Sequence, residues 1–531
     1  MIKWRLDERI KLILAFHKNQ LEVLGVIQRQ SLKFTIINFI GTFLGFLSVI
    51  FIHSLEKEMY GLFQFLHSSA SLLIPILGLG IHGAIIKYTP IFEKRNASNH
   101  FLAFSLVITT ICAAFSILLV SGLYYFLHPY LSIYFKNFKE TDENKFTILL
   151  LGVIFLYTAV FVALAISRYR IVVPDLINSV GLKIFLPILI LLYYFKIITS
   201  SGFINIAILY FILIAIVLFI YVLKLSNHDP KPRLNILNKS EYKGLFGFMF
   251  FSSLNSLGAN LALRMDVVMI GLMISKEAVG IYFIIQVIAN VMDIPNKAIS
   301  QITSPVIAKS WVDEDNNNIQ NIYEKSSIYG AIVSVFLFLM IYVIWADIIL
   351  LMPKGKDGLT LELALSIFTF LGLAKIVDIV TGVNSNIISY SKHYKYHMYF
   401  LVILGVFNLV LNYLFLTKYG LVGAAFATFL SVIIFNVLKH LFVYFKFGFS
   451  LKKLPLIQVI LIGVFVFVVM LIVQLPFHPI VNIITKVITL IILYAPIIWF
   501  ANPGGEVRRQ LSQILTDYKT YLPKVISKYL P

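Results

Sequence analysis

The sequence predicts an all-α polytopic membrane protein with about fourteen transmembrane helices. Of its 531 residues, 59% are hydrophobic and only 13% are charged, and the mean hydropathy is +0.89. A bilayer core about 30 Å thick requires about 20 apolar residues in a helix. Apolar stretches of that length predict spans at 32–52, 61–86, 100–128, 146–166, 176–195, 203–223, 246–274, 277–305, 326–347, 361–386, 398–416, 421–443, 455–474 and 480–501.

The distribution of lysine and arginine predicts the orientation of these spans. The two tails and the even-numbered loops carry 28 Lys and Arg residues, whereas the odd-numbered loops carry 9. Positive residues are retained on the cytoplasmic side of a membrane. We therefore expect both termini in the cytoplasm, and the net charge of +19 indicates topology rather than binding of nucleic acid.

A weak internal repeat divides the chain into two lobes. Met59-Tyr60-Gly61-Leu62-Phe63 opens the second span and Val279-Gly280-Ile281-Tyr282-Phe283 opens the eighth, and Pro75 and Pro295 follow at similar distances. Six spans separate equivalent points, so both six-helix lobes should enter the membrane in the same direction, related by a pseudo-two-fold axis along the membrane normal. The predicted parts are a cytoplasmic amphipathic segment at 1–31, an N-lobe at 32–223, a cytoplasmic linker at 224–245, a C-lobe at 246–443, two further spans at 455–501 and an amphipathic tail at 502–531.

The chain carries no motif of a catalytic, metal or cofactor site. Cys112 is the only cysteine, which excludes an intrachain disulfide and a cysteine-based metal cluster. The stretch 78–83 matches the letters of a dinucleotide fingerprint, but it lies inside a span with no preceding strand. We interpret these glycines as sites of flexibility or close helix packing, as also for Gly41 and Gly45 at GxxxG spacing. We expect no cofactor and no enzymatic activity.

Several cations lie within or at the edges of the predicted spans. They are Lys33, Lys183, Arg264, Lys297, Lys375, Lys439 and Lys486. Lys33 and Lys439 are close enough to a span end to extend to the inner surface. The other five lie deeper, where a charge costs about 2.5–3.5 kcal/mol on insertion scales and marks a counter-charge or an aqueous path. Cations outnumber the deep acids Asp266, Asp293 and Asp378, which favours an anionic substrate over a cationic drug.

The eighth span carries a stripe of polar residues on one helical face. Its members recur at intervals of three or four residues: Gln286, Asn290, Asp293, Lys297, Gln301 and Ser304. The second span has a softer version: Gln64, His67, Ser71, Pro75, Gly78 and His82. Such faces cannot lie in hydrocarbon, so they should line an aqueous cavity or a packed seam. We expect these two spans to form the walls of a central cavity.

Two further spans contribute polar groups, with two interpretations left open. Asn260 and Arg264 share one face of the seventh span, and Asp266 must point elsewhere. The pairs Asp293–Lys297 and Lys375–Asp378 have the spacing of intrahelical ion pairs that neutralise each other. Alternatively, Lys297 and Lys375, with Arg264 and Lys183, attract a phosphate, since opposite charges 4 Å apart gain about 4 kcal/mol at an effective dielectric of 20.

A set of diffuse signatures resembles a known family. They are Phe39-Ile40-Gly41-Thr42-Phe43-Leu44-Gly45, Glu58-Met59-Tyr60-Gly61-Leu62-Phe63, Arg264-Met265-Asp266 through Gly271, Val279-Gly280-Ile281-Tyr282, and Ser304-Pro305-Val306-Ile307-Ala308-Lys309. The chain is similar to bacterial polysaccharide flippases of the multidrug/oligosaccharidyl-lipid/polysaccharide exporter superfamily. The resemblance implies two rocking lobes in the bacterial inner membrane. It also implies transport of undecaprenyl-diphosphate-linked oligosaccharide to the periplasmic leaflet, for O-antigen, capsule or exopolysaccharide assembly.

These inferences yield a hypothesis and three rivals. Arg264 and Lys297 should hold the diphosphate with Lys183 or Lys375 assisting, and a Na⁺ or H⁺ gradient could act through Asp266, Asp293 or His82. Expected partners are the lipid-linked oligosaccharide, membrane lipids and polysaccharide-assembly proteins. A cation-coupled multidrug exporter of the same fold would require a more acidic cavity. A lipid II flippase is disfavoured because the arginines that the resemblance implies for its first span are missing here. A membrane-embedded polymerase or glycosyltransferase would require a large outward loop or a DxD site.

Overall fold

A computed structural model describes residues 37, 40–95, 97–134, 142–168, 170–225, 237–353, 358–472, 477–505 and 508. Within these ranges every regular element is helical. The predicted segment at 1–31, the middle of the predicted linker and nearly all of the tail after 505 lie outside the described residues.

The predicted all-α fold with many membrane-spanning helices is confirmed. Twelve helical stretches in the described residues are long and apolar enough to cross a membrane. One of them, α16 (Lys395–Phe447), contains two crossings separated at Gly420, where φ is 58° and ψ is −141°. The shorter apolar helix Ile40–Leu55 lies at the position of the first predicted span. The chain is therefore a multi-pass membrane protein built of helices.

The second, eighth and tenth spans are interrupted, which the sequence pattern did not predict. The second breaks between α2 (Lys57–Gly78) and α3 (Ile81–Lys94) at Leu79 and Gly80, both with positive φ. The eighth passes from α11 (Lys276–Ala289) through η4 (Asn290–Met292) into α12 (Asp293–Val312). The tenth breaks at Gly382 (φ 64°), between α14 (Leu361–Val380) and α15 (Asn384–Tyr390). Each break lies beside polar residues of the candidate site.

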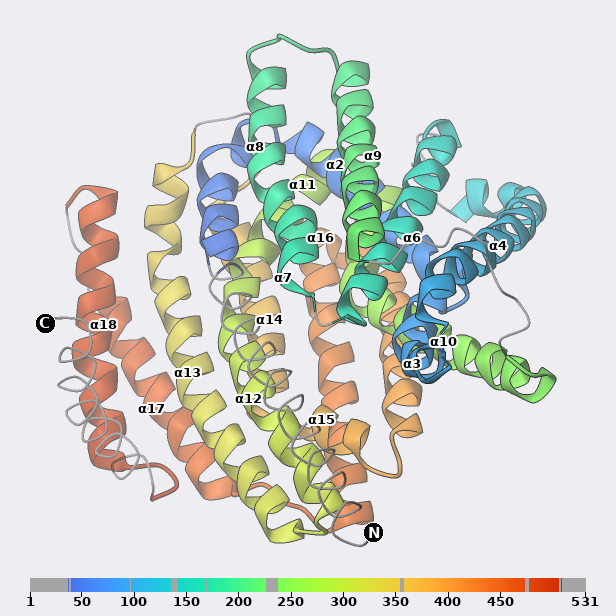
Figure 1. The fold of residues 1–531 in the computed structure, drawn as a ribbon. Helices are drawn as coiled ribbons and strands as arrows, with labels where there is room; N and C mark the ends of the chain where they lie inside the picture. The colour runs from blue at the N-terminus through green and yellow to red at the C-terminus, as the bar shows by residue number, and fades with distance from the viewer. Residues whose placement is uncertain are drawn as a thin grey trace, which may run out of the picture. The chain divides into compact units, whose positions relative to one another are not determined.

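The chain forms two compact units, 1–280 and 281–531. In unit 1, α2 packs against α6 and α10, and α6 also packs against α9 (Figure 1). The other elements of unit 1 have these bounds: η1 (His53–Leu55), α4 (Ser98–Tyr134), α6 (Lys145–Ile166), α7 (Val172–Asp175), η2 (Leu176–Val180), α8 (Gly181–Tyr194), α9 (Ser200–Leu225) and α10 (Lys239–Met273). The unit border lies after α10, whereas the predicted lobes divide before it. The lobe boundaries stay a prediction.

In unit 2, the long helix α13 (Asn316–Leu351) is the central element. It packs against α12 and α14 and also against α17 (Lys453–Ile472) and α18 (Pro479–Ala501), which lie beside each other and beside α13 in Figure 1. The seam is a cluster of buried apolar side chains: Ala331, Val335, Leu339, Val459, Val466, Met470, Leu490, Tyr494 and Ile498. The last two spans are thus anchored on one helix.

The two repeat motifs meet at their glycines. A Cβ atom on Gly61 of α2 would lie 1.8 Å from the carbonyl oxygen of Lys276 and 2.7 Å from the nitrogen of Gly280. A Cβ atom on Gly280 would lie 2.0 Å from the carbonyl oxygen of Lys57. The first turns of α2 and α11 are therefore in backbone contact, which only glycine allows.

Replacing Gly61 with alanine should separate these helix starts. The neighbouring atoms belong to the backbone and cannot rotate away, so we expect Gly61→Ala to cost about 1–3 kcal/mol of stability. Thermal unfolding of the purified protein in detergent would measure this. Gly122→Ala in α4 is the matched control, because nothing lies within 4 Å of a Cβ atom there. Equal unfolding temperatures for the two variants would contradict the contact.

Candidate functional site

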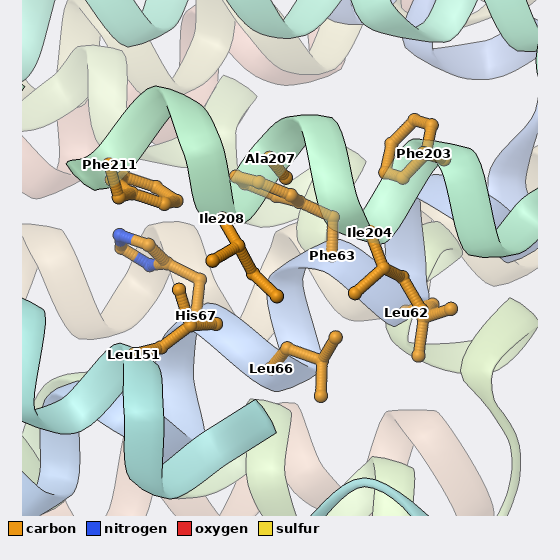
Figure 2. A pocket seen from close by; sticks show the side chains of 10 residues that line it. All are labelled: Leu62, Phe63, Leu66, His67, Leu151, Phe203, Ile204, Ala207, Ile208 and Phe211. Carbon is orange, nitrogen blue, oxygen red and sulfur yellow. The ribbon is translucent and has the colours of Figure 1, made fainter. Parts of the chain in front are cut away.

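Arg264 contacts His67 within unit 1. Its Nη1 lies 3.2 Å from Nδ1 of His67, and the guanidinium can only donate, so Nδ1 accepts and the imidazole is neutral in this contact. Figure 2 shows the imidazole beside the ring of Phe211, at a centroid distance of 5.9 Å. The ring of Phe155 lies 5.1 Å from it. Among the residues that the structure describes, no carboxylate pairs with Arg264.

The polar face of the second span forms a seam with α10. The hydroxyl of Ser253 donates to the carbonyl of Pro75 over 2.7 Å. A Cβ atom on Gly80 would lie 2.1 Å from the carbonyl oxygen of Met249, so the helix break is pressed against α10. This confirms the interpretation of stretch 78–83 as close packing. Gln64 and Ser71 of the same face are buried, as the packed-seam alternative requires.

The remaining predicted residues of unit 1 differ in their surroundings. Asp266 is fully buried, whereas Arg264 is half-buried. Asn260 donates to the carbonyl of Ser256 one turn earlier, over 2.9 Å. His82 has a buried Nδ1 atom that makes no hydrogen bond within the described ranges.

Lys183 lies against the first transmembrane helix. A Cβ atom on Gly41 would lie 3.5 Å from its Nζ, and one on Gly45 would lie 3.5 Å from its Cδ. The GxxxG pair thus allows close approach by the stem of a lysine side chain.

In unit 2, of the two interpretations left open, the intrahelical ion pairs Asp293–Lys297 and Lys375–Asp378 are wrong. Lys375 of α14 pairs with Asp293 of α12, at 2.7 Å between Nζ and Oδ2. Asp378 pairs with Lys439 of α16, at 3.7 Å. Both pairs join different helices: Asp293 and Lys375 connect α12 with α14, and Asp378 and Lys439 connect α14 with α16. Spacing along one helix could not reveal partners from another.

Lys439 does not extend to the inner surface, contrary to prediction. Its side chain is only 2% exposed, against 39% for Asp378. The ammonium donates to the hydroxyl of Ser385 over 2.9 Å and lies 3.9 Å from the ring centroid of Phe435. Asn436 donates to Asp378 over 3.1 Å. A buried network therefore joins α14, α15 and α16.

The polar stripe of the eighth span is partly packed against α15 and partly exposed. Asn386 of α15 donates to the hydroxyls of Ser300 and Ser304, over 2.7 and 3.0 Å. Gln286 and Asn290 are half-buried, and Gln301 is exposed. Lys297 is also exposed, and no acid in the described part of the chain pairs with it. The stripe is thus partly a seam and partly an accessible surface.

Lys486 of α18 pairs with Asp347 of α13. The Nζ–Oδ2 distance is 2.6 Å, and the ammonium also donates to the carbonyl of Val343 over 3.2 Å. Asn482 donates to the second carboxylate oxygen over 3.1 Å. Asp347, only 4% exposed, is thereby fully satisfied. This ion pair holds the last span, α18, against α13. Neither residue belongs to the polar stripe of the eighth span.

Comparison with family models assigns the chain. The model described as polysaccharide biosynthesis protein matches residues 29–311, more than half of the sequence. The chain belongs to this family. A second model, MatE, matches residues 252–414. No curated protein sequence matches the chain.

Solved structures show the same fold at low sequence identity. The lipid II flippase MurJ in an inward closed conformation is 16% identical, with a TM-score of 0.63, over 88% of this chain and 99% of that one. An inward-facing multidrug resistance MATE transporter of the MOP superfamily is 13% identical, with a TM-score of 0.56, over 77% and 94%. The chain therefore has a flippase and MATE transporter fold, and these similar proteins are transporters rather than enzymes.

Sequence reasoning missed several members of the polar network of unit 2. Asn386 and Asn436 carry the hydrogen bonds that join its helices. Asn436 and Lys439 are three residues apart, so they share one face of a predicted span. That spacing is the signal that could have identified them.

Replacing Asp378 should lower the stability of the protein more than replacing Lys439. Asp378→Asn leaves a buried ammonium without its counter-charge, which costs about 3–5 kcal/mol. Lys439→Met leaves a carboxylate that is 39% exposed and still bonded to Asn436, so its loss should be smaller. Thermal unfolding of both variants would check the order. The double variant should recover much of the stability; a further loss would contradict the pairing.

Proposed function

We propose that the protein is a flippase for undecaprenyl-diphosphate-linked oligosaccharide, moving it from the cytoplasmic to the periplasmic leaflet for surface polysaccharide synthesis. The family match and the transporter fold support transport of a lipid-linked saccharide. This function requires no catalytic centre, in agreement with the transporter relatives. The inner-membrane location and cytoplasmic termini belong to the same proposal.

One observation supports an anionic substrate over a cationic one. Lys375, Lys439 and Lys486 each have a carboxylate partner. Arg264 and Lys297 have none among the described residues. A membrane-embedded cation without a counter-ion is costly, and such residues mark substrate or ion paths. A diphosphate would supply the missing negative charge each time substrate binds.

The neutral His67 fits this role for Arg264. It orients the guanidinium through one nitrogen and leaves the remaining donors for a ligand. A carboxylate in the same place would compete with a phosphate. Lys375 is neutralised by Asp293, so it can assist only if that pair opens. Lys183 keeps an assisting role in the proposal, held against Gly41 and Gly45.

Charge-neutral substitutions test the substrate site. We expect Arg264→Ala and Lys297→Ala to abolish flipping of the lipid-linked oligosaccharide, because the diphosphate loses its counter-charges. Accumulation of that lipid in the cytoplasmic leaflet would be measured beside the abundance of each variant in the membrane. Lys309→Ala, an exposed cation near the end of the same helix α12, is the control.

Full transport by both variants would overturn this assignment. If neither variant nor wild type moved the lipid, while cationic drugs were exported, the multidrug exporter would replace the flippase. The MatE match is the reason to include that measurement.

Coupling to a cation gradient is part of the proposal. The residues proposed for it are Asp266, Asp293 and His82. Asp266 is the strongest, since it is fully buried and ionisable in a span. We expect Asp266→Asn to retain substrate binding but to lose the stimulation of transport by a Na⁺ or H⁺ gradient in proteoliposomes. If the Asp266→Asn variant still responded to the gradient, Asp266 would not be the residue that couples transport to it. The variants Asp293→Asn and His82→Gln would test the other two residues in the same assay.

A further inference from the structure

His67 of α2 lies among aromatic rings and has one charged neighbour. The ring centroids of Phe63, Phe155 and Phe211 are 5.9, 5.1 and 5.9 Å from that of the imidazole. The small pocket that His67 lines has otherwise apolar walls from α2, α6 and α9 (Figure 2). In the part of the chain that the structure describes, Arg264 of α10 is the one titratable group whose charge acts on this imidazole. The protonation of His67 therefore depends on the state of Arg264.

The contact between the two side chains admits only one protonation state of the imidazole. Nη1 of Arg264 lies 3.2 Å from Nδ1 of His67. A guanidinium has no acceptor, so Nδ1 is unprotonated and the single ring proton is on Nε2. A proton added at Nδ1 would remove the acceptor and place two cations side by side. The contact and the imidazolium therefore exclude each other.

An anion on the guanidinium would reverse this preference. Its negative charge would offset the positive charge that opposes a proton on His67, because an opposite charge within about 4–6 Å favours the charged form of a group. The three phenylalanine rings can accept an imidazolium, since the faces of aromatic rings attract cations within about 6 Å. Neither side chain is sealed in the interior, as both are half-buried. A bound anion and a proton on His67 thus favour each other.

We propose that His67 is a proton-binding positioning residue, and that binding of a diphosphate to Arg264 is linked to uptake of one proton at Nδ1 of His67. The hydrogen bond from Nη1 to Nδ1 breaks, a proton from water forms a new N–H bond at Nδ1, and the freed guanidinium donor turns to the phosphate. The inference deepens the proposed function and rests on it. The bound state holds one more proton than the free state, so affinity for the diphosphate rises as pH falls.

Calorimetry can count the proton directly. A short-chain polyprenyl diphosphate sugar is titrated into the full-length protein in detergent, in two buffers that differ in ionisation enthalpy. Each phosphate of this probe carries one negative charge across neutral pH, so the probe itself takes up no proton. We expect about one proton to be taken up per bound probe, and an affinity that increases about tenfold for each unit by which pH falls. Binding by the wild type with no proton uptake would overturn the proposal.

His67→Gln separates proton binding from a merely structural role. Glutamine offers an amide oxygen to Arg264 but has no group that titrates near neutral pH. This variant should bind the probe without proton uptake and with the same affinity at every pH. Proton uptake equal to that of the wild type would overturn the proposal. His128→Gln is the matched control, because His128 lies on α4, is 43% exposed and is not among the residues that line this pocket; it should behave as the wild type does.

Transport assays keep the two proposals distinguishable. Binding with uptake of one proton, but without flipping of lipid-linked oligosaccharide, would contradict the proposed function and leave the proton linkage intact. Flipping by a wild type that binds the probe without a proton would contradict the linkage alone. Unchanged binding and proton uptake in Arg264→Ala would overturn the role of Arg264 in both.

Discussion

A charged side chain in hydrocarbon must find an opposite charge or a polar ligand, and this requirement shapes the membrane interior of the protein. In unit 2 it is met between helices: Asp293 with Lys375, Asp378 with Lys439, and Asp347 with Lys486. Each pair connects two elements that are distant in sequence. In this unit, the contacts that neutralise buried charges are therefore also contacts that hold the helices together.

The same requirement applies to two cations that have no carboxylate partner among the described residues. Arg264 has a neutral imidazole as its hydrogen-bond partner, and Lys297 lies exposed on α12. Protein groups could have neutralised them, as they do for Lys439. Their unmatched charge is consistent with a ligand that arrives and leaves. The cost of holding these charges is then offset only during part of a transport cycle.

The sequence predicted the fold better than the contacts of the site. Hydrophobic length is a local property, so the helices that are long and apolar enough to cross a membrane could be identified from the sequence. The carboxylate partners of Lys375 and Lys439 depend on how the helices face one another. Spacing within one helix could therefore only suggest partners on that same helix, and these were wrong. Lys439 was misplaced for a related reason, since its distance from the span end said nothing about Ser385 and Phe435 around it.

The ion pair between Asp347 and Lys486 has a consequence for how the chain can vary. Asp347 belongs to α13, but its neutralising ammonium and its amide partner Asn482 both come from the final span. A shortened version that stopped before α17 would keep an orphaned carboxylate in its core. Acquisition or loss of the C-terminal hairpin is thus coupled to the residue at position 347, and the two should be inherited together.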